Sequence, residues 1–171
     1  MRAGRNAGAS VTTLELPAEF DGLTAAHKTI MQSEMRSSFL PEWRRFGDDL
    51  YPELVSILRN DAGQSRADLV AALDLAASCR ARFDALAREH DAILTPSTSG
   101  TAPPGPENTG SATFNRIWTM LHVPCVHVPG LTAADGLPVG VTIAGPRYSD
   151  RRVLCVATLL GAAIDGLRTA Q

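Results

Sequence analysis

The residues of this chain best suited to chemistry are one cysteine and two histidines close together in the sequence, His122, Cys125 and His127. Alternate side chains of a β-strand share a face, so an extended segment would place Cys125 beside His127. Such a pair could serve as nucleophile and base, or as metal ligands together with His122. Free cysteines are more commonly buried packing residues without reactivity. We therefore expect Cys125 and His127 to fill packing positions, and we predict no metal site.

Serine and lysine offer less support for catalysis. The only adjacent serine pair, Ser37-Ser38, has no flanking glycines, and the sequence contains no Gly-x-Ser-x-Gly motif of the kind that presents a nucleophile. Lys28 is the only lysine, and we expect it on the exposed side of a helix. The sequence therefore predicts no catalytic residue within this chain.

The composition indicates an ordinary globular domain. The chain has 171 residues, 44% of them hydrophobic and 20% charged, with a net charge of −2. Neither nucleic acid nor an anionic membrane is expected as a partner, because basic residues are not in excess. No apolar run reaches the ~20 residues of a membrane span, and the polar N-terminus does not resemble a signal peptide. Three cysteines make no disulfide framework, so we expect a cytoplasmic protein without a cofactor.

The elements that must position these residues alternate between helix and strand. We expect strands at residues 11–16 and at 91–96, the latter fully buried, and a late antiparallel hairpin formed by residues 125–128 and 137–144. Helices are expected over residues 21–37, from Pro52 to near Gly63, from Ser65 to near His90, within 113–121, and from about Asp150 to Gly166. Residues 39–49 are expected to be a connector and 97–110 a proline-rich loop. This order predicts an α/β fold with a mixed-direction β-sheet covered by α-helices.

Four segments of the sequence, in this order, resemble the amidase signature family. They are Leu16-Pro17-Ala18-Glu19-Phe20 with the helix after it, the strand at 91–96, the stretch from Asn115 to Pro124, and the closing strands with their helix. The closing strands contain Val-Pro-Cys-Val-His-Val-Pro-Gly from Val123 and Gly-Leu-Pro-Val-Gly from Gly136. The resemblance extends over residues 8–167 and implies the fold of the C-terminal part of such an enzyme.

The resemblance implies hydrolysis or transfer of carboxamides, a reaction on carbon–nitrogen bonds. In the family, a serine attacks the carbonyl, a second serine in a cis peptide relays a proton, and a lysine is the base. The Gly-Ser-Ser-Gly-Gly type of loop that holds the nucleophile does not occur here. Residues 1–171 are therefore expected to form a truncated, C-terminal segment that is inactive alone. The alternative is a non-catalytic α/β remnant that binds a partner or a small molecule.

The resemblance also indicates a wall of the substrate pocket, formed by the loop at 99–111 and by the substrate-binding residues Asn115, Trp118 and Thr119. The other interpretation makes Trp118 a core anchor and Asn115 a helix cap. The implied ligand is a small-molecule amide in the complete enzyme. We also expect a homo-oligomer, because the strands at 11–16 and 93–95 would leave sheet edge and apolar surface uncovered.

Overall fold

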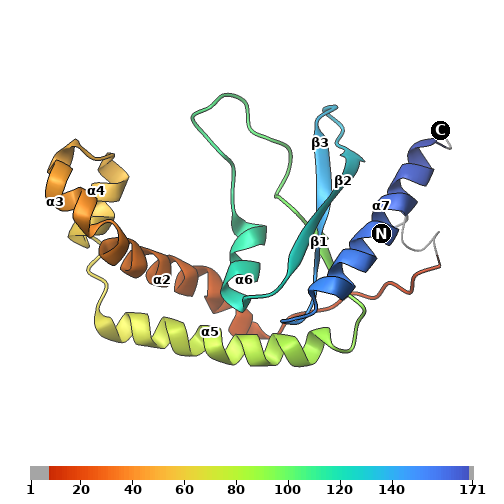
Figure 1. Cartoon of the computed structure of the whole chain (residues 1–171), viewed down its shortest axis with the longest axis horizontal. Coiled ribbons are helices and arrows are strands. Elements are labelled where there is room, and N and C mark those ends of the chain that lie inside the picture. Colours follow the sequence, from red (N-terminus) through yellow and green to blue (C-terminus); the bar gives the residue numbers. More distant parts are fainter. Residues whose placement is uncertain (1–7, 170–171) are drawn as a thin grey trace. The chain divides into compact units, whose positions relative to one another are not determined.

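The computed structural model describes residues 8–169, which form two compact units (Figure 1). The helical unit is Ala18–Cys79, and the sheet unit comprises Arg80–Gln171 and Met1–Pro17 in so far as they are described. Among these residues, no helix is both long and apolar enough to cross a membrane.

The helical unit contains helices only. They are η1 (Ala18–Gly22), α2 (Leu23–Ser38), α3 (Leu40–Phe46), η2 (Gly47–Asp49), α4 (Pro52–Arg59) and the first part of α5 (Arg66–Ala87). The predicted helices at 21–37, after Pro52 and from Ser65 are confirmed. The predicted connector at 39–49 is wrong, because α3 and η2 occupy it. Pro41 lies in the first turn of α3, where a missing N–H costs nothing, and Gly47 ends that helix at φ 56°.

Side-chain hydrogen bonds stabilise the end of α4 and the start of α5, on either side of the segment that joins these helices. Arg36 of α2 donates to Asn60 Oδ1 at 2.8 Å, where Asn60 ends α4 in the left-handed conformation. The predicted capping pair at the start of α5 is present, since Asp68 N donates to Ser65 Oγ and Ser65 N donates to Asp68 Oδ2. The hydrogen bonds from Ser65 lower the pKa of the Asp68 carboxyl.

The sheet unit has three strands in the order β1-β3-β2 and two further helices. The elements are β1 (Ile93–Pro96), α6 (Thr113–Leu121), β2 (Cys125–Thr132), β3 (Pro138–Ala144) and α7 (Asp150–Thr169). The predicted hairpin is confirmed, with His127 opposite Thr142. Both strand pairs are antiparallel, so the mixed direction expected for the sheet is not found among the described strands.

Three finer expectations for this unit are wrong. Residues 11–16 form no strand, since they pair with none of the described strands. Strand β1 is not fully buried; its residues alternate between partly buried and exposed, because successive side chains point to opposite faces of the sheet. Helix α7 continues through Gly166 to Thr169, since a glycine inside a helix costs only about 1 kcal/mol and does not by itself end it.

The two faces of the sheet differ in chemistry. One face packs on α7 around Val128, Ile143 and Val153, and this apolar core continues along α7 to Ile164. Gly130 lets β2 approach this helix closely, since a Cβ there would lie 2.8 Å from Ile164 Cγ2. The opposite face, which we call the polar face, carries the residues of the alternate register. They are Thr95, Ser97, Cys125, His127, Gly140 and Thr142, together with the apolar Ile93 and Ala144 at one end. Helix α6 lies on the other side of the strands from α7 (Figure 1).

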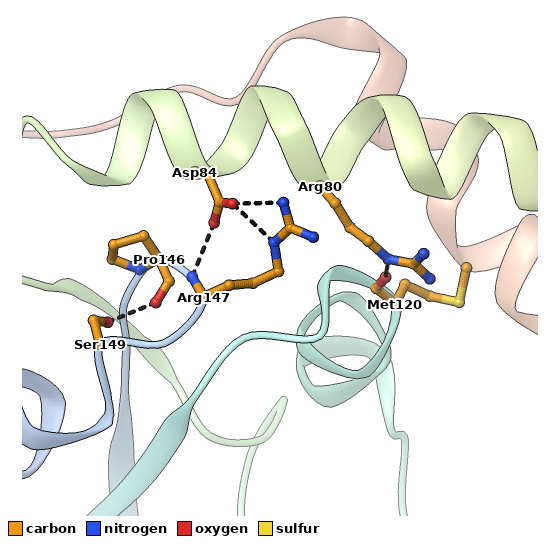
Figure 2. A network of polar contacts seen from close by, with 6 residues as sticks. All are labelled: Arg80, Asp84, Met120, Pro146, Arg147 and Ser149. Atoms are coloured by element: carbon orange, nitrogen blue, oxygen red, sulfur yellow. Dashed lines mark hydrogen bonds and ion pairs between the residues drawn. The ribbon is translucent and has the colours of Figure 1, made fainter.

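A polar network attaches the C-terminal half of α5 to the ends of α6 and β3 (Figure 2). Buried Asp84 accepts hydrogen bonds from Arg147 N at 2.9 Å and from Arg147 Nε at 2.8 Å. Arg80 Nε donates to Met120 O at 2.7 Å. Burial alone would raise the pKa of Asp84, but the hydrogen bonds and positive charge of Arg147 outweigh it and hold the pKa below its ordinary value. The loop between β3 and α7 is thereby fixed relative to α5.

Candidate functional site

A cluster of hydroxyl and imidazole groups lies on the polar face. The hydroxyl of Ser97 is 2.7 Å from His127 Nδ1 and 2.9 Å from Thr142 Oγ1. Ser97 is 8% exposed and Thr142 is 4% exposed, whereas His127 is exposed. We call these three residues the Ser97 cluster. Within it, the exposed His127 is hydrogen-bonded to the buried Ser97, which in turn contacts the buried Thr142.

The strands position this cluster through their register. His127 of β2 lies opposite Thr142 of β3, and Ser97 follows β1 with its N–H donating to Gly140 O at 3.3 Å. Gly140 is required by close approach, since a Cβ there would collide with His127 Cε1 and lie 2.7 Å from Nε2 and 2.6 Å from Val128 O. The imidazole ring therefore lies directly against the backbone of β3. No local sequence pattern predicts this contact, because His127 and Gly140 lie on different strands.

The predicted substrate-binding residues lie on α6 in two different environments. Asn115 is exposed, and its Nδ2 donates to Ser97 O at 3.3 Å, which brings it to the Ser97 cluster. Thr119, one turn further on and also exposed, donates to Asn115 O. Trp118 is 5% exposed and packs against Phe83, with ring centroids 5.7 Å apart. The structure thus places Asn115 and Thr119 at the surface of α6, and Trp118 in the core behind it.

The proline-rich loop predicted at 97–110 is confirmed, and it is attached to the hairpin turn. Thr101 Oγ1 donates to Asp135 Oδ2 at 2.8 Å, and Leu137 N donates to Asp135 Oδ1 at 3.1 Å. The hydrogen bond from Thr101, followed by that from Leu137 N, lowers the pKa of Asp135. The loop therefore leaves β1 at Ser97, contacts the β2–β3 turn, and returns to α6.

The packing interpretation of Cys125 and His127 is wrong. Cys125 and His127 do share a face of β2, as the alternation predicted, but both are exposed because no described element covers that part of the polar face. His122 ends α6 in the left-handed conformation, with Nε2 3.0 Å from Arg80 Nη2. Within the described part of the chain, no group of three or more His, Cys, Asp or Glu side chains could hold a metal ion.

The distance between Ser97 and His127 would suit a nucleophile and its base, but the surroundings do not. The Ser97 hydroxyl is buried and has Thr142 as a second partner, so a substrate carbonyl has no access to it. No side chain orients the imidazole from its other nitrogen among the described residues. Lys28, on α2 of the helical unit, is exposed as predicted. The cluster is therefore built to hold the histidine in place, and not to activate the serine.

The fold and the sequence together define the class of this protein. The profile of the Amidase family matches residues 12–154, and the chain belongs to this family. A curated relative is AmiA2 of Mycobacterium tuberculosis (strain ATCC 25618 / H37Rv), whose name assigns it to the amidases; it is 30% identical over 145 residues. This match covers 76% of the present chain and 30% of AmiA2. The chain thus spans about a third of the length of the relatives it matches.

Solved structures confirm the fold. An inhibitor-bound vestigial protein complex, described as revealing the origins of an s-triazine catabolic enzyme, has a TM-score of 0.78 at 23% identity. It covers 97% of this chain, which corresponds to 38% of that one. The allophanate hydrolase of Kluyveromyces lactis has a TM-score of 0.75 at 18% identity, with 95% of this chain and 28% of that one covered. The predicted α/β amidase-signature fold is therefore confirmed for this chain.

Proposed function

We propose that this chain is the C-terminal segment of an amidase that hydrolyses carbon–nitrogen bonds of small carboxamides. The observation that carries the proposal is the Amidase family match over residues 12–154. Part of the polar face is exposed at Cys125 and His127, and this supports the same assignment, since an enzyme that closes over it could place a substrate there.

In this proposal the segment supplies sheet and pocket wall, and the reacting groups come from a part of the enzyme outside residues 1–171. The sequence has no Gly-Ser-Ser-Gly-Gly loop, and its one lysine is an exposed helix residue. Asn115 and Thr119 face the substrate from α6. Trp118 contributes to substrate binding by holding this wall in place from the core, because its ring packs on Phe83.

Association with another chain is part of the proposal. Strands β1 and β2 are the edges of the three-stranded sheet and carry unpaired backbone groups, which favour pairing with a further strand. We infer that the isolated chain forms a homo-oligomer through these edges and the polar face. The cysteines Cys79, Cys125 and Cys155 are all free, which supports a cytoplasmic location. A monomer at high concentration in sedimentation velocity would contradict the association.

The hydrolysis of an aryl amide tests the proposed function. The purified chain alone should release no arylamine, whereas activity should appear when the preceding part of a relative such as AmiA2 is added as a separate chain. Removal of a whole catalytic unit leaves almost none of the rate enhancement, so the contrast should be large. Turnover by the chain alone that survives Cys125→Ala would show that the chemistry resides in residues 1–171, and would reject the proposal.

A further inference from the structure

The guanidinium group of Arg36, in the last turn of α2, is hydrogen-bonded only to neutral groups. Its Nη1 donates to Asn60 Oδ1 at 2.8 Å and to Gln64 Oε1 at 3.3 Å, and its Nη2 donates to Ser33 Oγ at 2.9 Å. No Asp or Glu side chain of the described residues forms an ion pair with it. Arg36 is half-buried, and charges taken partly out of water are normally paired. Its positive charge is therefore available to an anionic ligand.

The hydrogen bonds of Arg36 also fix the orientation of three side-chain amides. A guanidinium only donates, so the atoms of Asn60 and Gln64 that face it must be oxygens. Gln64 Nε2 is therefore the donor in its 2.7 Å contact with Gln32 Oε1. The amino group of Gln32 is left over by this arrangement, and no acceptor for it is found among the described residues.

Two N–H groups of Arg36 are left over as well. A guanidinium has five of them, and three are used by Asn60, Gln64 and Ser33. The N–H of Nε and one N–H of Nη2 remain. Two donors on neighbouring nitrogens of one planar group match the two oxygens of a carboxylate, which can accept both hydrogen bonds in parallel.

The residues with unused donors line a small hollow of the helical unit. Its lining comprises Gln32, Arg36, Ser56, Ile57, Asn60 and Ala62, and its volume is about 30 Å³. This volume is enough for one or two water molecules or for a carboxylate group. Ser56 adds a hydroxyl to the wall, Ile57 and Ala62 add apolar surface, and none of the lining residues is acidic.

We propose that this hollow binds the carboxylate group of a small aliphatic acid, which accepts hydrogen bonds from Arg36 Nε and Nη2 and from the amino group of Gln32. The alkyl part of the acid lies against Ile57 and Ala62. A neutral amide of the same shape brings an NH₂ group to a site that offers only donors, so the hollow selects the acid. The site goes beyond the proposed amidase function, which does not use Arg36.

Titration of the 171-residue chain with sodium acetate tests the site. In ¹H–¹⁵N spectra, one arginine Nε–H signal and one glutamine amide signal should shift saturably, and Arg36→Lys and Gln32→Ala assign these two signals by their loss. Acetamide at the same concentration is the neutral control, and sodium chloride at the same ionic strength is the control for screening. Neither control should reproduce the shifts.

The same variants measure the contribution of each donor. Gln32→Ala should bind acetate about fivefold more weakly, the loss expected for one hydrogen bond. Arg36→Lys retains the charge but not the paired donors, and should bind about tenfold more weakly. Arg44→Lys, at an exposed position of α3, is the matched control and should bind unchanged.

Gln32→Ala leaves every hydrogen bond of Arg36 in place, so it tests the site even if Arg36→Lys disturbs the end of α4. Four results would overturn the proposal. They are no saturable shift with acetate, an equal response to acetamide, an equal response to chloride, and undiminished binding by Gln32→Ala. None of these measurements depends on amide hydrolysis, so the proposed function stands or falls separately.

Discussion

Replacement of Trp118 by alanine and by phenylalanine separates its role in the core from a direct role in a pocket wall. The side chain is 5% exposed and packs on Phe83. Its Nε1 is buried and has no hydrogen-bond partner among the described residues. Trp118→Ala should therefore reduce the free energy of unfolding by about 3–5 kcal/mol, through lost burial and the cavity that remains.

Trp118→Phe is the matched control, and its expected effect is small. The smaller ring loses about 1 kcal/mol of apolar burial at ~25 cal/mol per Å². It also removes a buried N–H without an acceptor, which relieves about 1–3 kcal/mol. The two effects oppose each other, so this variant should be as stable as the unsubstituted protein or up to about 2 kcal/mol more stable.

Urea unfolding followed by far-ultraviolet circular dichroism measures both variants under the same conditions. A cost below about 1 kcal/mol for Trp118→Ala would show that this residue is not part of the core. If Trp118→Phe were as unstable as Trp118→Ala, the indole N–H would have a partner and the reasoning about its burial would fail.

Three further outcomes are expected. Gly140→Ala should destabilise the chain by about 1–3 kcal/mol, because the new Cβ collides with the His127 ring and Val128 O. In urea unfolding, the double variant with His127→Ala should recover only part of this loss, since the contact with Val128 O remains. Asp84 has a lowered pKa in the folded state, so its contribution to stability is present above its unfolded pKa, about 3.9, and is lost as the pH falls through the folded value. Asp84→Asn should accordingly be less stable than the unsubstituted chain at neutral pH, and the difference should shrink in unfolding curves as the pH falls below about 3.9; a difference that does not change with pH would contradict the assignment. Thr101→Val should free the proline-rich loop from Asp135 and raise its amide hydrogen exchange, with Thr98→Val as the control on the same loop.

The parts of the fold that the sequence predicted are those with local signals. Ser65 and Asp68 lie three residues apart and form the predicted capping pair, and the hairpin follows from two β-type segments joined by a glycine-containing turn. The strand expected at 11–16 failed because β-type residues form a strand only where another strand pairs with them, and sequence gives no information on that partner. The sequence does not predict helix α3, because Pro41 and Gly47 are typical of loops, although both are also favourable at helix ends.

The candidate site was only partly predictable for a related reason. The family resemblance indicates Asn115 as a substrate-binding residue, whereas the residue types at His127 and Cys125 allow catalysis or metal binding but favour packing positions. Ser97 and Thr142 were not recognised as candidates, because the contacts that make them important join residues 30 and 45 positions apart. The alternation of β3, with Gly140 and Thr142 on one face and Val141 and Ile143 on the other, was the one available sign that a polar face existed.

The most direct test of the account locates the nucleophile in the two-chain enzyme. The preceding part of a relative is supplied with its nucleophilic serine replaced by alanine, and aryl amide hydrolysis is compared with that of the unsubstituted pair. We expect this replacement to abolish activity, whereas Ser97→Ala in the present chain should leave the acyl-enzyme step intact and change mainly KM. Two results would contradict the assignment of this chain as a pocket wall without catalytic groups. One is full activity with the partner that lacks its nucleophilic serine. The other is loss of the acyl-enzyme only when a residue within 1–171 is substituted.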